Sequence, residues 1–231
     1  MIMDMRIAGR GNIPAGEYNK VSGSGSIKLF GNVRCVSFSS AGSSKGENIE
    51  CAENFKASGS SSFLGSVRAK NVKACGSFFC AGNLTAEENI IFKGKSKIEK
   101  SVKCNHLSSY GLFSVMKNIE AENVVTAGVI KCEGLVNAEN ITIKTDKISS
   151  IGSIGGSNIT VKRKKVSFFR KRKVIVSSAI EGDNIFLDHV TAPRVTGRIV
   201  SIGKGSVIEL VQYSEKLEIS PRAKVLKTEK I

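Results

Sequence analysis

Few residues in this chain have the types and spacing that catalysis or metal binding requires. The 231 residues include only two histidines, His106 and His189, and no Cys or Ser partner is evident for His189. The segment Gly203-Lys204-Gly205-Ser206 lacks the earlier glycine that a Walker-type phosphate loop needs. We therefore expect no catalytic residue, no metal site and no cofactor, and we expect that the protein is not an enzyme.

The six cysteines follow the pattern of small core residues rather than of metal ligands, since no Cys-x-x-Cys pair occurs. Four of them fall in predicted inward columns: Cys35, Cys80, Cys104 and Cys132. The column of Cys35 also includes Ala52 and Ala69. Cys51 is expected to face water, because the residue one repeat later is Arg68. Cys75 precedes a predicted corner and is expected to be a second surface thiol.

The segment 162–173, KRKKVSFFRKRK, is the strongest local charge signal, with eight Lys or Arg residues and no acidic residue. It supplies +8 of the formal net charge of +15. The residues that could contact an anionic surface are Lys162, Arg163, Lys164, Lys165, Phe168, Phe169, Arg170, Lys171, Arg172 and Lys173. Three interpretations stay open: a solvated loop, a contact with an anionic membrane surface, and, as the weakest, a contact with nucleic acid.

A repeat in the sequence predicts the structural elements that carry these residues. Glycine recurs with gaps of 17 or 18 residues at Gly25, Gly42, Gly59, Gly76, Gly94, Gly111 and Gly128. A second series with the same period is mostly asparagine: Ser37, Asn54, Asn71, Asn89, His106, Asn123, Asn140 and Asn158. A third series includes Gly31, Gly65, Gly82, Gly134 and Gly152. Independent series that share one period indicate a solenoid.

Glycine and asparagine are the residues that most readily take a positive φ, with histidine behind them. We therefore interpret each series as a row of corners, and His106 as a substitute for asparagine in one of them. The stretches between corners are too short for helices and alternate apolar with polar residues, as half-buried strands do. Parallel connections are overwhelmingly right-handed. The prediction is an all-β protein, a right-handed parallel β-helix (β-solenoid) of roughly ten triangular coils of about 17 residues.

The chain organisation predicted from the repeat has three parts. Residues 1–22 form an N-terminal segment that could cap the helix, residues 23–211 form the β-helix with the basic insertion 162–173, and residues 212–231 form a C-terminal strand or cap. Apolar side chains of the last layers, Leu210 and Leu217, are candidate assembly contacts, because an uncapped β-helix exposes a strand edge at each end.

The repeat units Gly-x-[Val/Ile/Leu]-x-Ala/Cys and Glu-Asn-[Ile/Val]-x-[Ala/Thr/Ile] resemble those of bactofilins, polymer-forming bacterial cytoskeletal β-helix proteins. Segments 7–11, 14–18, 180–187 and 207–213 are similar to a longer bactofilin-like subgroup. The resemblance implies end-to-end self-assembly without nucleotide into filaments or patches that localise client proteins, whose identity it does not give. It offers no catalytic residue to carry over.

Two functional classes therefore remain at the level of the sequence. The first is a self-assembling scaffold, and the alternative is a monomeric basic binding module for an anionic membrane surface or nucleic acid. No apolar run is long enough to span a membrane, and the opening MIMDMRIAGRGN is unlike a signal peptide. We expect a cytoplasmic protein, with a peripheral position at the inner face of the membrane as the further option.

Overall fold

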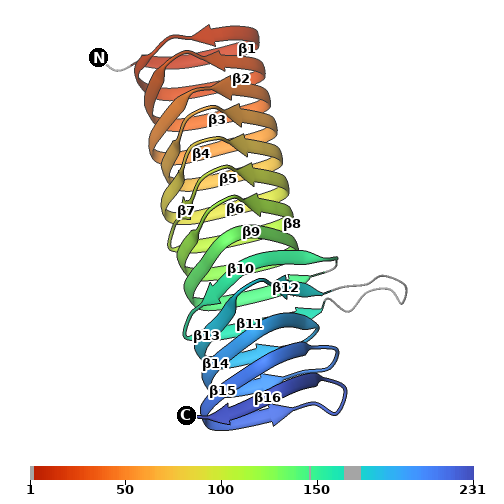
Figure 1. The fold of residues 1–231 in the computed structure, drawn as a ribbon. Coiled ribbons are helices and arrows are strands. Elements are labelled where there is room, and N and C mark those ends of the chain that lie inside the picture. The colour runs from red at the N-terminus through yellow and green to blue at the C-terminus, as the bar shows by residue number, and fades with distance from the viewer. Residues whose placement is uncertain (1–2, 146, 164–172) are drawn as a thin grey trace. The chain divides into compact units, whose positions relative to one another are not determined.

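The computed structural model describes residues 3–145, 147–163 and 173–231. Every regular element in these residues is a β-strand, and the strands pair in parallel. They form a β-solenoid of about 13 turns with a spacing of about 17 residues (Figure 1). This confirms the predicted fold class. The turns outnumber the roughly ten that the sequence predicts, because residues 3–22 and 212–230 also lie in paired strands.

The chain divides into two compact units, Met1–Val115 and Met116–Ile231. In unit 1 each long strand pairs with the next one along the chain, and both β7 and β8 pair with β6. Its strands are β1 (Met3–Ile13), β2 (Gly16–Leu29), β3 (Asn32–Gly46), β4 (Asn48–Phe63), β5 (Val67–Cys80), β6 (Leu84–Ile98), β7 (Val102–Lys103) and β8 (His106–Val115).

Unit 2 follows the same principle with shorter strands. Its strands are β9 (Ile119–Thr145), β10 (Ser149–Gly155), β11 (Asn158–Arg163), β12 (Val174–Val176), β13 (Ala179–Leu187), β14 (Val190–Ile202), β15 (Val207–Ile219) and β16 (Lys224–Lys230). Strands β10 and β11 both pair with β9 and with β13, so two strands in succession make up one turn. The last three strands then pair in chain order, β14 with β15 and β15 with β16.

The first six members of the first glycine series, Gly25 to Gly111, form a column in unit 1 in which each glycine pairs with the next. Every member has a positive φ; that of Gly76 is 110°. A Cβ on Gly76 would also collide with the carbonyl oxygen of Gly59, and the same holds along the column. Glycine is therefore required at each of these corners for two reasons: the backbone conformation and the close approach of the adjacent turn.

The asparagine series is also a column, but not because of its backbone conformation. His189 is the only non-glycine residue with a positive φ among the described residues, so the predicted left-handed corners at Asn71 and His106 are wrong. The chain bends there through a register shift beside the asparagine, such as the one between Ala69 and Asn71. The side chains instead form an amide ladder, in which Asn89 Nδ2 donates to Asn71 Oδ1 at 2.8 Å.

The inward cysteine column differs from the prediction at one turn. Cys51 is only 3% exposed and pairs with Cys35 and Ala69, whereas Ala52 is exposed. The turn from Cys35 to Cys51 is one residue shorter than the repeat period of 17, and this places Cys51 inward. A register shift before Asn54 then restores the repeat period. The two Sγ atoms lie 3.5 Å apart.

The other inward cysteines are buried as predicted, and Cys75 is half-buried. Burial raises the pKa of Cys80 and Cys132 to about 11 and that of Cys104 to about 12. The hydrogen bond to Cys35, together with burial, holds the pKa of Cys51 far above its usual range. These thiols stay protonated at neutral pH and pack as small apolar residues.

Candidate assembly edges and basic insertion

Strand β1 leaves one edge of unit 1 without a partner strand, because its only pairing in the described part of the chain is with β2. Met5 lies over Val21, which lies over Phe38 and then Phe55, so Met5 ends a core column of this unit that contains two of its buried phenylalanines. Met5 and Ile7 are half-buried, and Met3 is 60% exposed. We call this set, Met3, Met5 and Ile7 on β1, the N-terminal edge.

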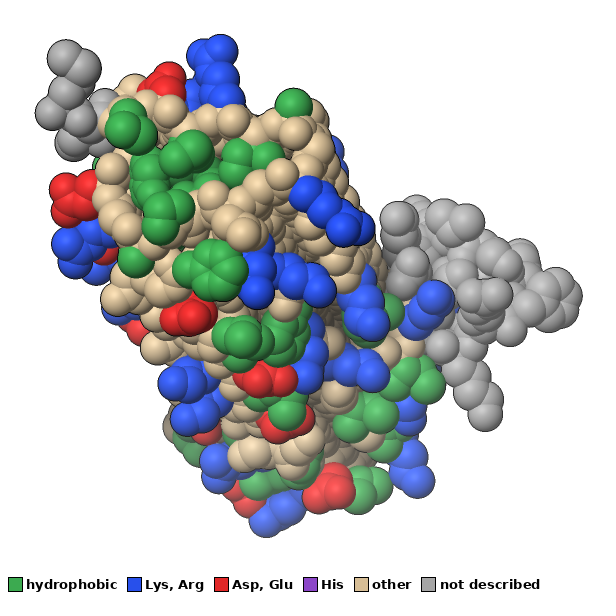
Figure 2. Space-filling model, turned by 90° about the horizontal axis from the view of Figure 1, so that it is seen from above, with side chains coloured by type: hydrophobic (Ala, Val, Ile, Leu, Met, Phe, Trp, Pro, Cys, Tyr) green, Lys and Arg blue, Asp and Glu red, His purple; other side chains and the backbone are tan. Residues whose placement is uncertain are grey.

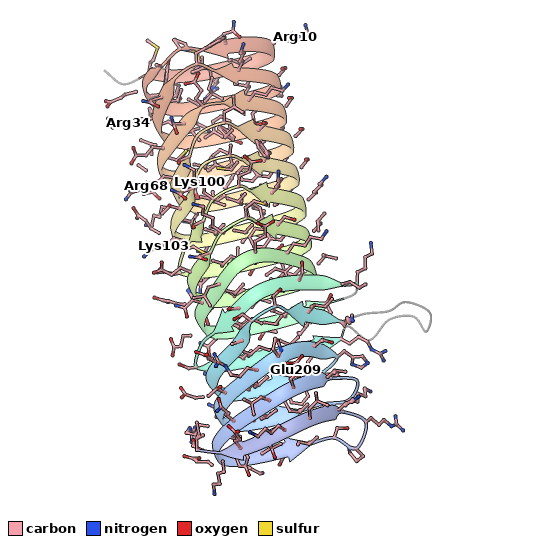
Figure 3. All side chains as sticks on the ribbon, viewed as in Figure 1. Arg10, Arg34, Arg68, Lys100, Lys103 and Glu209 are labelled. Carbon is pink, nitrogen blue, oxygen red and sulfur yellow. The ribbon has the colours of Figure 1, made fainter. Side chains whose placement is uncertain are left out.

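Charged side chains lie around the N-terminal edge rather than on it. Figure 2 shows hydrophobic side chains gathered on the end of unit 1, with charged ones toward its margin. Asp4 accepts a hydrogen bond from Asn19 Nδ2 at 2.8 Å. Arg6 and Arg10 are exposed, and Arg10 lies at this end of the unit (Figure 3). An apolar centre with a polar margin is the usual composition of a protein–protein contact.

The last strand of unit 2 leaves a second edge, which is more polar. β16 pairs with Val207–Tyr213 of β15, and residues 214–219 of β15 have no further described partner strand. Ile219 is 42% exposed, Leu226 63% and Ile231 65%. Lys227 forms an ion pair with Glu229, which also accepts a hydrogen bond from Gln212 Nε2 at 3.0 Å. Charged side chains of this kind make a strand edge less prone to further pairing.

The two leucines predicted as assembly contacts lie in different environments. Leu217 pairs with Val200 and belongs to residues 214–219 of β15, which together with β16 we call the C-terminal edge. Leu210 pairs with both Arg194 and Lys227, so β16 already covers its backbone. Both side chains are half-buried. The N-terminal edge was not among the predicted assembly contacts, although the alternation of Met3, Met5 and Ile7 is a recognisable strand pattern.

Only three residues of the basic insertion fall within the described part of the chain. Lys162 and Arg163 end β11, and Lys173 comes directly before β12. The backbone of Lys173 accepts a hydrogen bond from Ser149 N–H at 3.0 Å, and Arg163 pairs with Thr145, so the insertion starts and ends at one corner. The remaining candidates lie outside the described residues: Lys164, Lys165, Phe168, Phe169, Arg170, Lys171 and Arg172.

Lys162 has two neighbours that the sequence did not indicate. It pairs with Lys144 of β9, which stacks two exposed cations on adjacent strands. Its Nζ lies 5.1 Å from the ring centroid of Phe186, a cation–π contact. Phe186 is 36% exposed and belongs to β13. Like charges on adjacent strands repel each other, so this arrangement favours an anionic partner.

An outward face of unit 1 shows the opposite arrangement, in which charges alternate. Arg34 lies 3.6 Å from Glu17 and 3.4 Å from Glu50, and Arg68 lies 3.9 Å from Glu50. Figure 3 shows Arg34, Arg68 and Lys103 on the same side of the unit. All of the side chains in these three ion pairs are well exposed, so each pair contributes little to stability. The alternation leaves this face without a strong net charge.

The two histidines occupy structural positions. His106 pairs with Asn89 in the asparagine column. His189 has a φ of 59°, and its Nδ1 lies 2.6 Å from Asp188 Oδ1. The hydroxyl of the adjacent turn, Ser206, is buried; it donates to Leu187 O and accepts from Val190 N–H. The Asp188–His189 pair thus holds a turn, and the Ser206 hydroxyl is committed to backbone groups.

A surface hollow of about 530 Å³ lies beside this turn. Phe186, Asp188, Lys204, Glu218 and Ile219 contribute to its walls, and acidic and basic side chains are mixed there. Among the described residues, no group of three or more His, Cys, Asp or Glu side chains is arranged to hold a metal ion. The described residues also include no helix long and apolar enough to cross a membrane.

Comparison with known proteins gives one distant relative. No protein-family model matches the chain, and no solved structure matches it. A Bacillus subtilis (strain 168) protein named "Uncharacterized protein YhbF" is 31% identical over 99 residues, which is 42% of this chain. The match spans 42% of the length of that relative as well.

Proposed function

We propose that this protein is a non-enzymatic scaffold that assembles with copies of itself through its terminal strand edges. The observation that carries the proposal is the N-terminal edge: among the described residues β1 pairs on one side only, and it places Met3, Met5 and Ile7 at the end of the buried core. Unpaired strand edges readily add a further strand, and natural solenoids either cap them or pair them. Here β1 presents apolar side chains where a capping repeat would present polar ones.

The C-terminal edge supplies the second contact that an open polymer needs. A head-to-tail contact leaves a free edge on each new subunit, so growth continues. Leu217 and Ile219 are apolar residues of that edge on β15, and Leu226 is an exposed one on β16. The resemblance of the repeats to bactofilins supports the same interpretation, with nucleotide-independent filaments or patches that position client proteins. The relative in Bacillus subtilis carries no argument about function.

Sedimentation velocity and electron microscopy without nucleotide test this proposal. Ile7→Lys places a charge at the N-terminal edge, Leu217→Lys places one at the C-terminal edge, and Ser60→Lys adds the same charge at an exposed site within β4. We expect wild type and Ser60→Lys to assemble at about 0.1 M and about 1 M NaCl, because apolar contacts resist salt. Because every head-to-tail contact joins both edges, each edge variant alone should be a monomer, and the double variant should be a monomer as well.

Two outcomes would overturn the proposal that the protein is a self-assembling scaffold. One is a wild-type monomer at every salt and protein concentration, which would favour the alternative of a monomeric basic binding module. The other is filaments that persist in the double variant with normal length. Far-UV circular dichroism of each variant separates a loss of contact from a loss of fold, since the β-sheet signal must remain.

A further inference from the structure

Successive turns of unit 2 place a basic side chain at the same corner. These corners lie immediately before β10, β12, β14, β15 and β16. The residues at the start of each of these strands pair with those at the start of the next one in this series. Four of these corners carry exposed cations, Lys147, Lys173, Lys204 and Arg222, which we call the basic corner. Their sequence positions are unevenly spaced, so the strand register alone brings them into line.

Backbone hydrogen bonds between these corners establish the alignment. Ser149 N–H donates to Lys173 O at 3.0 Å, and Val174 N–H donates to His189 O at 3.0 Å. His189 N–H then donates to Lys204 O at 3.0 Å, and Gly205 N–H donates to Arg222 O at 2.9 Å. Each corner thus lies directly against the next, at about the spacing of adjacent strands, ~4.8 Å.

The cations of the basic corner differ from other cations of unit 2 in their ion pairing. In the part of the chain that the structure describes, none of its four cations forms an ion pair with a carboxylate, and Asp188 is bonded to His189 instead. Other cations of unit 2 are paired: Arg194 with Glu181, Arg198 with Glu215, Lys216 with Glu218, and Lys227 with Glu229. Unpaired exposed cations in one line attract a polyanionic surface.

Exposed apolar side chains lie next to these cations. Ile148, adjacent to Lys147, is 48% exposed, and Ile219, just before the last corner, is 42% exposed. Lys144 and Lys162 extend the positive charge along the two strands that lead into the first corners. A cation beside an aliphatic side chain is the combination found at membrane interfaces, where the charge meets headgroups and the apolar group enters the acyl boundary.

We propose that the basic corner of unit 2 is a docking surface for anionic lipid headgroups, with Ile148 entering the interface. Proteins that bind single-stranded nucleic acid use positively charged grooves with aromatic stacking platforms, whereas the hollow beside this corner has Asp188 and Glu218 in its walls as well as Lys204. Among the described residues, Phe186 is an exposed ring beside the corner, and Lys162 lies over it. The proposal stands on unit 2 alone and does not depend on self-assembly.

Vesicle flotation of the full chain tests the proposal with two charge-matched variants. The corner variant changes Lys147, Lys173, Lys204 and Arg222 to Gln, and the control variant changes Lys45, Lys56, Lys73 and Lys95, exposed cations of unit 1, to Gln. The probes are phosphatidylcholine vesicles with and without phosphatidylglycerol, and a single-stranded oligonucleotide followed by fluorescence anisotropy. Each cation near an anionic membrane is worth about a factor of five in affinity, so four of them multiply to roughly several hundredfold if all reach the surface. The corner variant should therefore bind phosphatidylglycerol vesicles at least about tenfold more weakly.

The control variant should change by less than about threefold, since it keeps all four cations of the basic corner. Binding of the wild type to vesicles should weaken with salt and should require phosphatidylglycerol. Ile148→Ser should lower the fraction of protein that floats with the vesicles, without changing the binding of the oligonucleotide. Equal loss in the corner and control variants would overturn the proposal. Tighter, corner-dependent binding of the oligonucleotide than of the vesicles would overturn it in favour of nucleic acid.

Discussion

At the scale of single residues, the fold depends on positions where no side chain can be accommodated. Each glycine of the first column has a positive φ and lies against the carbonyl oxygen of the previous glycine. Gly65 and Gly82, of the third series, have no positive φ but are equally constrained, because a Cβ would collide with Asn48 or with the backbone of Gly65. Close approach of adjacent turns therefore explains more of the glycine content than backbone conformation does.

Gly76→Ala tests this requirement. The substitution meets both a φ of 110° and the carbonyl oxygen of Gly59, so we expect unfolding free energy to fall by about 2–4 kcal/mol. Urea unfolding followed by far-UV circular dichroism measures the loss. Ser77→Ala, at the exposed next position, should change stability by less than about 0.5 kcal/mol. Similar stability of the two variants would show that the turns can move apart to accept a side chain.

At the scale of the element, columns of identical residues connect the turns. In unit 2, Asn140 Nδ2 donates to Asn123 Oδ1 at 3.1 Å, and Asn158 Nδ2 donates to Asn140 Oδ1 at 2.9 Å. Asn184 continues the ladder to Asn158 at 2.9 Å across the 26 residues that include the basic insertion. The insertion thus leaves the ladder intact, because the strands on either side of it resume the same register.

Asn140→Ala should break the ladder at its centre. It removes one donated and one accepted hydrogen bond in a half-buried position, so we expect a loss of about 1–2 kcal/mol in unfolding free energy. Glu139→Ala, at the exposed preceding position, is the control and should be close to neutral. The same urea titration applies. A neutral Asn140→Ala would mean that water replaces the amide partners without cost.

At the scale of the whole molecule, the two proposed activities reside in different parts. Assembly uses the strand edges and apolar contacts, whereas lipid binding uses the unpaired cations of the basic corner in unit 2. Assembly should therefore resist salt, whereas lipid binding should weaken with salt. An assembled scaffold would present many basic corners at once, which raises its apparent affinity for a membrane through avidity.

The separation of the two activities can be measured directly. The corner variant should still assemble at about 1 M NaCl, since none of its four positions lies on β1 or in residues 214–219. The double edge variant, Ile7→Lys with Leu217→Lys, should still bind phosphatidylglycerol vesicles in a salt-sensitive way, but more weakly because avidity is lost. Loss of assembly in the corner variant would mean that the cations act within the polymer contact instead.

The sequence by itself determined the period, the parallel β-solenoid and the glycine and asparagine columns, because each follows from repetition. The glycine column also depends on local backbone limits, whereas the asparagine column depends on side-chain hydrogen bonds between turns. Only the tertiary structure placed Cys51 inward, since one turn is a residue short and the correction lies in the pairing of β3 with β4 and β5. It also showed that β16 covers the backbone of Leu210 and leaves Leu217 at an edge. Lys147, Lys173, Lys204 and Arg222 follow no constant spacing, because the insertion and turns of unequal length intervene, and only strand register aligns them.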